Sequence, residues 1–450
     1  MGIEQFDLFV IGTGTAGKRV AYACAEAGWS VAIADNREYG GTCANRGCDP
    51  KKVLVGITEV MELSSNLVGK GIVDAPEVKW EDLQKFKETF VDAIPFTTER
   101  KIEEAGIKMY HQTPKFLDEN TLSVEGKTVK AKKIVIATGL VPLELKIPGR
   151  EHALFSDDFL DLPKLPKSMV FIGAGYIGME FAHIAARCGV EVTMIDSNEH
   201  ILSPFDSDLA DYLQENSEQM GITFHLNAKV NEIEKLRKNF RVSAEKNGET
   251  IEVKTEMVFN TAGRVPAIDE LELDKGNVAF EKGGVSVNEY LQNTTNPNVY
   301  ACGDVSASGS LPLTPISSQE ARIVEKNLLQ GNTHKFDVPI TPSVVFTQPQ
   351  LASVGMLEEE AKNSGHEVAV HFNNVPDWYN SKRLNQNCYA YKIILDKNTE
   401  EILGAHLLSR DAAETINLFV MAISGKLKCT DLKAMVFTYP SWSSDIKSMV

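Results

Sequence analysis

The sequence predicts an α/β fold with two Rossmann-like dinucleotide-binding units, and two observations lead to this prediction. First, the spacing Gly-x-Gly-x-x-Gly occurs twice in the 450 residues, once near the N-terminus and once near the middle. Second, each copy lies between an apolar run of β-forming residues and a stretch of helical character. An alternation of strand, glycine turn and helix is typical of parallel sheets that bind nucleotides at helix N-termini.

The first unit spans residues 6–35 as a strand, a helix over 18–27 and a second strand. Gly12 permits the tight turn after the first strand, Gly14 lets the backbone approach a pyrophosphate, and Gly17 allows close packing of the helix. The second strand ends at Asp35, which suits a ribose hydroxyl. A plain tight turn is the alternative, and the strand–helix–strand context favours cofactor binding.

The second unit spans residues 168–196 and carries Gly173, Gly175 and Gly178. Asp196 follows the first of these glycines by 23 residues, the same offset as in the first unit. Two such sites indicate two dinucleotides, or one dinucleotide and one flavin, held so that a hydride passes between them.

Asp196 also bears on the choice of nicotinamide. A carboxylate accepts a hydrogen bond from the free 2′-hydroxyl of NADH but repels the 2′-phosphate of NADPH, which usually meets Arg or Lys. Residues 196–200, Asp-Ser-Asn-Glu-His, contain neither Arg nor Lys. We therefore expect NADH to be preferred over NADPH.

Charge and hydrophobicity exclude several classes of partner. The chain has 46 Lys and Arg residues against 62 Asp and Glu residues, a formal net charge of −16, and no basic clusters. This balance argues against a nucleic-acid or anionic-membrane partner. No apolar run approaches the roughly 18–20 residues that span a bilayer, and the acidic N-terminus does not resemble a secretory signal. We therefore expect a cytoplasmic protein.

Seven cysteines form an odd, sparse set, unlike the dense even set of a disulfide-stapled secreted domain. Cys24, Cys188 and Cys302 follow or lie in apolar elements and are expected to be core residues. The sequence around Cys388 and Cys429 does not indicate a role for either residue.

Cys43 and Cys48 stand apart because they lie in a segment rich in Gly, Asn, Arg and Asp. Three interpretations compete: half of a zinc site, two inert core thiols and a redox-active disulfide. The chain offers no second pair of metal ligands at comparable spacing, so we expect no metal site, and this segment is a poor core. On an ideal helix the two residues are displaced by about 7.5 Å along the axis, beyond the roughly 7 Å limit of a disulfide. A bridge needs a distorted turn, which Gly47 allows, and Lys51 or Lys52 would stabilise a thiolate.

The motif Gly-Gly-Thr-Cys-x-Asn-x-Gly-Cys-x-Pro-x-Lys over residues 40–52 closely resembles the redox motif of the FAD-dependent pyridine nucleotide–disulfide oxidoreductases, which include glutathione reductase, dihydrolipoamide dehydrogenase and mercuric reductase. Five more segments resemble family motifs in family order: 134–139, 261–266, 299–304, 313–315 and 342–349. The chain is identified as a member of this family on these motifs.

The resemblance implies that NAD(P)H docks against the second unit and passes hydride to FAD, which then opens a Cys43–Cys48 disulfide. Cys48 corresponds to the flavin-proximal, charge-transfer thiol and Cys43 to the interchange thiol that attacks substrate. Lys52 matches the family's lysine near the flavin, and Glu180 matches its ion-pair partner. Tyr176 matches an aromatic that gates the nicotinamide pocket, although a packed aromatic at a helix start is the alternative.

The resemblance also implies cofactor contacts beyond the glycine motifs and their acids, and Asp304 among them corresponds to the contact to the flavin's ribityl chain. These residues are Thr42, Lys52, Thr138, Gly139, Tyr176, Gly263, Arg264, Gly303, Asp304 and Thr314.

The resemblance fails near the C-terminus. Disulfide-reducing members carry His-Pro-Thr-x-x-Glu, and this His–Glu pair works in the partner subunit's active site. Here Tyr439 replaces the histidine and Ser444 the glutamate, with Asp445 one residue further. A tyrosine, with an unperturbed pKa of about 10, is a poor base at neutral pH but can donate a proton or hydrogen bond. We count Tyr439 among the catalytic candidates. Mercuric reductases also carry a tyrosine near this position.

Two functions follow. The first is a disulfide reductase of the glutathione reductase type, acting on a small disulfide or a thiol–disulfide partner. The alternative is a mercuric reductase-like or quinone- or metal-ion-reducing enzyme. The activity of a dihydrolipoamide dehydrogenase is less favoured, because the oxidation of a dithiol needs a base and Tyr439 is a poor base.

The expected architecture is an FAD-binding domain over residues 1–148 and 265–335, an NAD(P)-binding domain over 149–264, and a mixed α/β dimerisation domain over 336–450. Pro-rich linkers near residues 147–166 and 338–342 agree with these boundaries. The resemblance predicts a homodimer whose active site is completed by the partner's C-terminus.

Overall fold

The computed structural model describes residues 2–450. Contacts between residues divide the chain into two compact units. The first unit comprises Met1–Lys52, Lys85–Leu143 and Arg264–Pro339, and the second comprises Val53–Gln84, Glu144–Gly263 and Ile340–Val450. The division into three domains with the boundaries given above stays a prediction. Along the chain, α3 (Cys48–Asn66) and α4 (Trp80–Val91) each begin in one unit and end in the other.

The first unit is built on a seven-stranded sheet with the order β3-β2-β1-β6-β5-β4, in which β18 also pairs with β6. Strands β1, β2, β3, β6 and β18 run parallel, whereas β4 and β5 are antiparallel additions. The last four residues of β1 are all buried, as expected for a parallel strand covered on both faces. The strands are β1 (Glu4–Ile11), β2 (Val31–Ala34), β3 (Lys108–Tyr110), β4 (Lys115–Asp118), β5 (Thr121–Val124), β6 (Lys127–Ile136) and β18 (Val299–Ala301).

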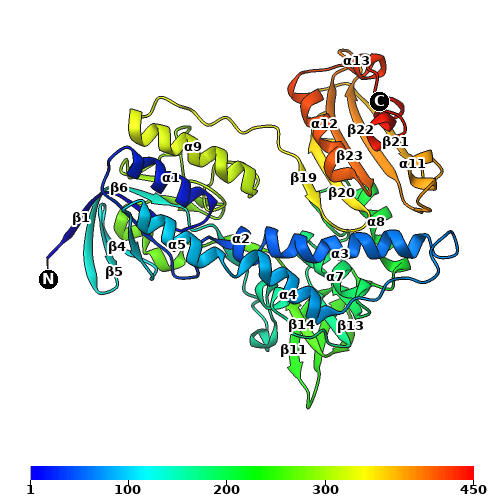
Figure 1. The fold of residues 1–450 in the computed structure, drawn as a ribbon, viewed down its shortest axis with the longest axis horizontal. Helices are drawn as coiled ribbons and strands as arrows, with labels where there is room; N and C mark the ends of the chain where they lie inside the picture. Colours follow the sequence, from blue (N-terminus) through cyan, green and yellow to red (C-terminus); the bar gives the residue numbers. More distant parts are fainter. Residues whose placement is uncertain (1) are drawn as a thin grey trace. The chain divides into compact units, whose positions relative to one another are not determined.

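Two helices of this unit matter most for the site. Helix α1 (Thr15–Glu26) and helix α9 (Thr314–Gln330) lie side by side (Figure 1), and Arg19 Nε on α1 pairs with Glu325 Oε2 on α9 at 3.0 Å. The remaining elements of the unit are α2 (Thr42–Arg46), α5 (Ile94–Glu104), η2 (Asp269–Leu271), η3 (Leu273–Gly276) and the two-stranded ribbons β7 (Leu140–Pro142) with β15 (Arg264–Pro266) and β16 (Phe280–Glu281) with β17 (Gly284–Val285).

Helix α1 begins three residues earlier than the predicted helix over 18–27 and therefore contains Gly17. The glycine spacing hid this start because glycine is a poor helix former in general. Here Gly17 is needed inside the first turn, since a Cβ at that position would overlap Gly12 O and lie 3.3 Å from Val10 Cγ1.

The second unit repeats the strand–helix–strand arrangement that the sequence predicts. Its parallel sheet has the order β10-β9-β8-β14, with β8 (Ser168–Ile172), α7 (Tyr176–Arg187) and β9 (Glu191–Ile195) forming the predicted unit. An antiparallel three-stranded sheet follows in the chain. The other elements of this region are η1 (Arg150–His152), α6 (Ser156–Leu160), α8 (Ser207–Gln219), β10 (Thr223–His225), β11 (Lys229–Lys235), β12 (Phe240–Lys246), β13 (Glu249–Thr255) and β14 (Met257–Asn260).

The C-terminal part of the second unit is a five-stranded antiparallel sheet with the order β19-β20-β23-β22-β21. Helix α12 (Ala412–Ser424) packs against β20 and β23 of this sheet (Figure 1). The remaining elements are β19 (Ser343–Val345), β20 (Gln350–Gly355), α10 (Glu358–Asn363), β21 (Val368–Asn374), α11 (Tyr379–Lys382), β22 (Ala390–Asp396), β23 (Ile402–Ser409), α13 (Cys429–Ala434), η4 (Trp442–Asp445) and α14 (Ile446–Met449). Across residues 2–450, no helix combines the length and apolar character needed to cross a bilayer.

A cluster of aromatic rings forms part of the core of the second unit. The fully buried Phe159 ring stacks on Phe181 with centroids 4.3 Å apart and meets Phe259 edge-on at 5.6 Å. Such pairs add about 0.5–1.5 kcal/mol to the free energy gained from burial. The cluster therefore holds α6, α7 and β14 together.

We expect Phe159→Ala to lower the free energy of unfolding by about 3–5 kcal/mol, because it removes a buried ring and leaves a cavity. Denaturant unfolding of the purified variant measures this. The matched control is Phe280→Ala on β16, where the side chain is exposed, and its effect should stay within about 0.5 kcal/mol. Equal losses in the two variants would contradict the assignment of Phe159 to the core.

Candidate active site around Cys43 and Cys48

The two cysteines of the predicted redox pair lie on either side of a break between two helices. Helix α2 ends at Arg46, and α3 begins at Cys48. A Cβ at Gly47 would lie 2.9 Å from Thr42 O and 3.3 Å from the Cα of Cys43. The absence of a side chain at Gly47 therefore lets the chain turn back on itself, as the five-residue spacing of the cysteines requires.

Thr314, the first residue of α9, contacts both sulfur atoms. Its Oγ1 donates a hydrogen bond to Cys43 Sγ at 3.3 Å and lies 3.7 Å from Cys48 Sγ. The sequence analysis placed Thr314 with the flavin on the strength of a resemblance. Nothing in the sequence indicated its contact with the cysteines, because 266 residues separate it from Cys48.

The surroundings of the two thiols shift their pKa values in opposite directions. A hydrogen bond from Cys43, the Thr314 hydroxyl and the charge of Lys51 together lower the pKa of Cys48 to about 6, against the effect of burial. The same hydrogen bond, together with burial, raises the pKa of Cys43. Cys48 also begins a helix of 19 residues, whose dipole favours a thiolate at its N-terminus. Both residues are free thiols in this structure, and the two opposite pKa shifts favour ionisation of Cys48 over Cys43 in the reduced pair.

Lys18 adds a cation that the sequence analysis did not single out. It follows Gly17 directly on α1, and its Nζ donates a hydrogen bond to Gly40 O at 3.3 Å, three residues before Cys43. Burial and the charge of Lys101 lower the pKa of Lys18, whereas the charge of Cys43 raises it. Lys18 therefore places a cation near the segment that carries Cys43.

The first glycine motif has the shape that a dinucleotide needs. Gly12 has a φ of +109°, and a Cβ there would overlap Ala137 O. A Cβ at Gly14, in contrast, would meet no protein atom closer than the Cα of Gly41, at 3.9 Å. Because Gly41 is itself too close to Gly14 to bear a Cβ, two bare backbone segments face each other at the N-terminus of α1. This arrangement fits the pyrophosphate of FAD.

The second glycine motif has the same properties. A Cβ at Gly173 would lie 2.5 Å from Thr261 O, and a Cβ at Gly178 would overlap Gly173 O, whereas Gly175 faces open space. The open position again lies at a helix N-terminus, since Gly175 immediately precedes α7. The motif therefore fits the pyrophosphate of a second dinucleotide.

The two acids after the second strands occupy equivalent positions. Asp35 Oδ2 accepts hydrogen bonds from the backbone N of Thr13 at 2.8 Å and from its hydroxyl at 2.6 Å. Asp196 Oδ2 accepts a hydrogen bond from Ala174 N at 2.6 Å, and its Oδ1 accepts one from Asn198 N at 2.8 Å. Each carboxylate therefore braces the glycine loop of its own unit, and a carboxylate oxygen has a further lone pair for a ribose hydroxyl.

The predicted cofactor contacts that follow β6 are Thr138 and Gly139, and those that follow β14 are Gly263 and Arg264. The Thr138 hydroxyl is buried with no hydrogen-bond partner among the described residues. Gly139, with a φ of +67°, and Gly263, with a φ of +135°, both face open space. Arg264 Nη2 donates a hydrogen bond to Leu140 O at 2.6 Å. An unpaired buried hydroxyl normally has a partner, and a bound cofactor would supply one here.

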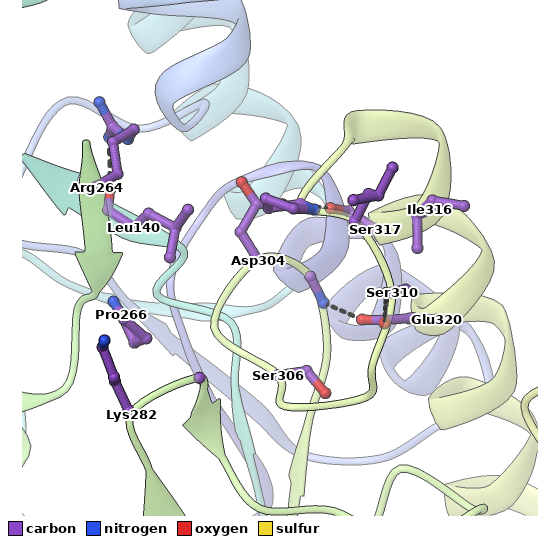
Figure 2. A pocket seen from close by; sticks show the side chains of 14 residues that line it. Leu140, Arg264, Pro266, Lys282, Asp304, Ser306, Ser310, Ile316, Ser317 and Glu320 are labelled. Atoms are coloured by element: carbon purple, nitrogen blue, oxygen red, sulfur yellow. Dashed lines mark hydrogen bonds between the residues drawn. The ribbon is translucent and has the colours of Figure 1, made fainter. Parts of the chain in front are cut away.

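A pocket of about 220 Å³ lies beside the predicted ribityl contact, Asp304. Figure 2 shows Asp304 facing Ser317 of α9, whose hydroxyl donates to Asp304 Oδ1 at 3.0 Å. Burial raises the pKa of the Asp304 carboxyl, while Ser317 and Arg264 lower it. The backbone N of Gly303 donates to Glu320 on the same helix at 2.7 Å. Ser317 and Glu320 were missed by sequence reasoning because they lie in an ordinary amphipathic helix.

Three other residues that the family resemblance implies, Lys52, Glu180 and Tyr176, differ in exposure and lie on two different helices. Lys52 is exposed on α3. Glu180, on α7, is 3% exposed, and its Oε1 accepts a hydrogen bond from Phe346 N at 2.8 Å. Lys52 and Glu180 belong to different units, so their ion pair stays a prediction. Tyr176 begins α7 and is 53% exposed, which does not agree with the alternative that it is a packed core aromatic.

The C-terminal candidates separate into an exposed and a buried group. Tyr439 is 74% exposed, and its ring lies 6.4 Å from that of Tyr379. Asp445 Oδ2 accepts hydrogen bonds from Asn380 Nδ2 and from the hydroxyl of Tyr389, both at 3.0 Å. Burial raises the pKa of Asp445. Asp445 thus anchors the C-terminal segment, whereas Tyr439 presents its side chain at the surface. Ser444 donates its hydroxyl to the backbone of Ser441.

The other cysteines have the character of core residues. Cys24 and Cys302 are fully buried, and Cys388 and Cys429 are buried. Burial raises the pKa of Cys24 to about 12 and that of the half-buried Cys188 to about 11. Within residues 2–450, no three side chains of His, Cys, Asp or Glu come together as a metal-binding group.

Comparisons with known proteins bear directly on these observations. Residues 6–321 match the pyridine nucleotide-disulphide oxidoreductase family, and residues 341–450 match the dimerisation domain of the same family. A glutathione reductase of Nostoc sp. is 33% identical over 99% of each chain. A mercuric reductase of Staphylococcus aureus is 28% identical over 98% of this chain and 81% of its own.

Among solved structures, the Cu(II) complex of the HOCl-induced flavoprotein disulfide reductase RclA from Escherichia coli matches with a TM-score of 0.87 at 29% identity, covering 99% of each chain. The α/β fold class with a dimerisation domain and the family resemblance are thereby confirmed. The chain belongs to the family of FAD-dependent pyridine nucleotide–disulphide oxidoreductases and is a flavoprotein disulfide reductase.

Proposed function

We propose that this enzyme uses NADH to reduce a small disulfide or a thiol–disulfide partner by way of FAD and the Cys43–Cys48 couple. The observation that carries the proposal is the contact of both sulfur atoms with Thr314, in a pair whose charge lies on Cys48 and whose proton lies on Cys43. This arrangement is the reduced form of a thiol–disulfide exchange site. The odd, sparse set of seven cysteines supports a reducing, cytoplasmic location.

FAD, when bound, takes a hydride from the nicotinamide and delivers two electrons to a disulfide. The loop over residues 12–17 would hold its pyrophosphate, and Thr42, Thr138 and Asp304 would hold the rest of it. The loop over residues 173–178 would hold the nicotinamide dinucleotide.

Cys43 is the nucleophile of the proposed exchange, and its proton leaves as its sulfur attacks. The hydrogen bond between the two cysteine side chains gives that proton a path to the Cys48 sulfur in the same step. Cys43 Sγ then attacks one sulfur of the substrate disulfide and displaces the other as a thiolate. Cys48 passes its proton to that thiolate, attacks Cys43 Sγ in the mixed disulfide, and releases the second thiolate as the Cys43–Cys48 bond reforms.

Tyr439 completes the proposed site in a homodimer. Its exposed hydroxyl can donate a hydrogen bond or a proton to the departing sulfur but is a poor base at neutral pH. The dimerisation domain over residues 341–450 supports a homodimer in which this segment serves the partner's cysteine pair. Lys52, beside the flavin, would pair with the carboxylate of Glu180, which limits the cost of burying that carboxylate.

A second candidate function is the reduction of a thiol-binding metal ion. The observation that favours it is Tyr439, because a metal ion bound by Cys43 and Cys48 needs no protonation of a leaving thiolate. The similarity to a mercuric reductase and to a flavoprotein solved as a Cu(II) complex points the same way.

The charge on Cys48 can be tested by titration of the reduced enzyme. We expect its thiolate to be present above about pH 6 and to be protonated below it, because the pKa of Cys48 is lowered by Cys43, Thr314 and Lys51. Thr314→Val should raise this pKa, since it removes a hydrogen-bond donor from both sulfur atoms. Thiolate absorbance and the alkylation rate as functions of pH measure the shift.

The control for this titration is Thr89→Val, because the Thr89 hydroxyl bonds only to Phe86 O of its own helix, at 2.6 Å. This variant should titrate like the wild type. A titration curve unchanged in Thr314→Val would show that Thr314 does not set the acidity of the pair.

The nicotinamide preference can be tested by steady-state kinetics. We expect kcat/KM to be higher for NADH than for NADPH by at least about tenfold, which corresponds to ~1.4 kcal/mol. The reason is repulsion between Asp196 and a 2′-phosphate, and His200 offers no compensation because its Nδ1 lies 2.8 Å from Asp211 Oδ1. Asp196→Ser should lower the ratio of kcat/KM for NADH to that for NADPH. The control is Asp269→Ser, which removes an exposed acid on η2 and should leave this ratio unchanged. A large advantage for NADPH would overturn the proposal.

The acceptor can be tested by reducing the enzyme anaerobically with NADH and offering oxidised glutathione, lipoamide, mercuric ion and a quinone separately. We expect a disulfide to reoxidise the flavin, and Cys43→Ser to slow this by roughly a thousandfold because the nucleophile is lost. Cys188→Ser is the matched control and should behave like the wild type. Rapid reoxidation by mercuric ion or quinone alone, retained in Cys43→Ser, would refute the disulfide assignment.

Tyr439→Phe separates the two candidate functions in the same assay. It should slow turnover of a disulfide, whose leaving sulfur needs a hydrogen-bond donor, and leave metal-ion reduction unchanged. Unchanged turnover of a disulfide would exclude an acid role for Tyr439.

A further inference from the structure

Glu320 is a buried carboxylate that no sequence motif marked. It lies on α9 and is 1% exposed. Its Oε2 accepts a hydrogen bond from Gly303 N at 2.7 Å, and its Oε1 accepts one from the hydroxyl of Ser308 at 2.5 Å. Oε1 also accepts a hydrogen bond from the hydroxyl of Ser310, at 2.9 Å (Figure 2). A single side chain thus fastens both ends of the loop 303–310 to one helix.

The charge of this carboxylate is costly. Within residues 2–450, no Lys, Arg or His forms an ion pair with Glu320, and its three donors are neutral groups. A buried carboxylate without a cation is expensive even when it is hydrogen-bonded. Burial accordingly raises the pKa of Glu320, while Ser308, Ser310 and Gly303 lower it and Asp304 raises it. A neutral glutamine could make comparable hydrogen bonds at lower cost, so the negative charge calls for an explanation.

The loop that Glu320 holds contains the predicted flavin contact. Asp304 directly follows Gly303, and its Oδ1 accepts a hydrogen bond from Ser317, which precedes Glu320 by three residues on α9. Residues three apart on a helix lie on the same face. Gly303 has a φ of +78°, and a Cβ there would lie 3.3 Å from Ala16 Cβ. The same face of α9 therefore fixes two consecutive residues, 303 and 304, at the rim of the pocket of about 220 Å³.

The same helix also reaches the redox pair. Thr314, its first residue, contacts Cys43 and Cys48, and Glu320 follows it by about 9 Å along the helix axis. The groups that face Glu320 or its pocket from other elements are Asp304, Cys302, Arg264 and Lys282. A charge on Glu320 thus lies close to the atoms that would hold the flavin.

We propose that Glu320 is a positioning residue of the flavin site, which holds the loop 303–310 and the Asp304 carboxylate in place and sets a buried negative charge beside the cofactor. This inference rests on the FAD site of the proposed function. Glu320 acts through Gly303 and Asp304 and through its charge. A fixed negative charge opposes the uptake of electrons by a nearby flavin, so it lowers the reduction potential.

The first test is titration of FAD into flavin-free protein, which requires neither nicotinamide nor acceptor. Glu320→Ala should weaken FAD binding by at least about tenfold, because the loop loses its three hydrogen bonds. Glu320→Gln, which preserves size and hydrogen bonding, should bind FAD within about threefold of the wild type. The matched control is Glu270→Gln, which removes an exposed carboxylate of η2 in the same unit without touching the loop. FAD binding that is unchanged in Glu320→Ala would overturn the inference.

The second test is the midpoint potential of bound FAD in Glu320→Gln, which does not depend on Glu320→Ala folding. The potential should shift to a more positive value at neutral pH, and the shift should shrink as the pH falls, because the wild-type carboxyl then becomes protonated and neutral. Glu270→Gln should show neither effect. A potential equal to that of the wild type at all pH values would overturn the role of the charge. Failure of NADH or disulfide turnover leaves both measurements unaffected, so the inference and the proposed reaction fail separately.

Discussion

The redox site depends on one constraint: two sulfur atoms five residues apart must both reach the hydroxyl of Thr314. A continuous helix would carry the two cysteines about 7.5 Å apart along its axis. The break at Gly47 removes this separation, since only a residue without a side chain fits against Thr42 O. Once the sulfur atoms meet, hydrogen bonding divides their acidities, with Cys48 ionised and Cys43 protonated.

Helix α9 links this pair to the rest of the first unit. Thr314, Ser317 and Glu320 lie in the first two turns of the helix, and Ser317 shares a face with each of the other two. The first contacts the sulfur atoms, the second holds Asp304, and the third holds Gly303 and two serines. Because hydrogen bonds to buried charged groups are stronger than those between neutral groups, this face is a rigid support. The cofactor site and the redox pair therefore share one scaffold, and a shift of α9 would disturb both.

The C-terminal segment is the part of the chain that departs from the motif of the disulfide-reducing members of the family. The Asp445 carboxylate accepts hydrogen bonds from Asn380 and Tyr389 and so anchors the C-terminal segment. It is therefore not a free acid that could replace the missing glutamate. Tyr439 is left exposed beside Tyr379. An exposed phenol donates a hydrogen bond but does not accept a proton at neutral pH. This chemistry suits the reduction of a disulfide or a metal ion better than the oxidation of a dithiol.

The sequence by itself determined the features that depend on neighbouring residues. The glycine spacings, the strand–helix–strand units and the Cys43–Cys48 pair were all predictable, because tight turns and helix starts impose requirements on residues close together in the chain. It also led to the family, which the comparisons confirmed. Only the tertiary structure decided that Thr314 contacts the cysteines, that Glu320 holds Gly303, and that Asp445 is an anchor. Each of these contacts joins residues brought together by the packing of separate elements, and a polar residue in an amphipathic helix carries no local signal of the partner that it will meet.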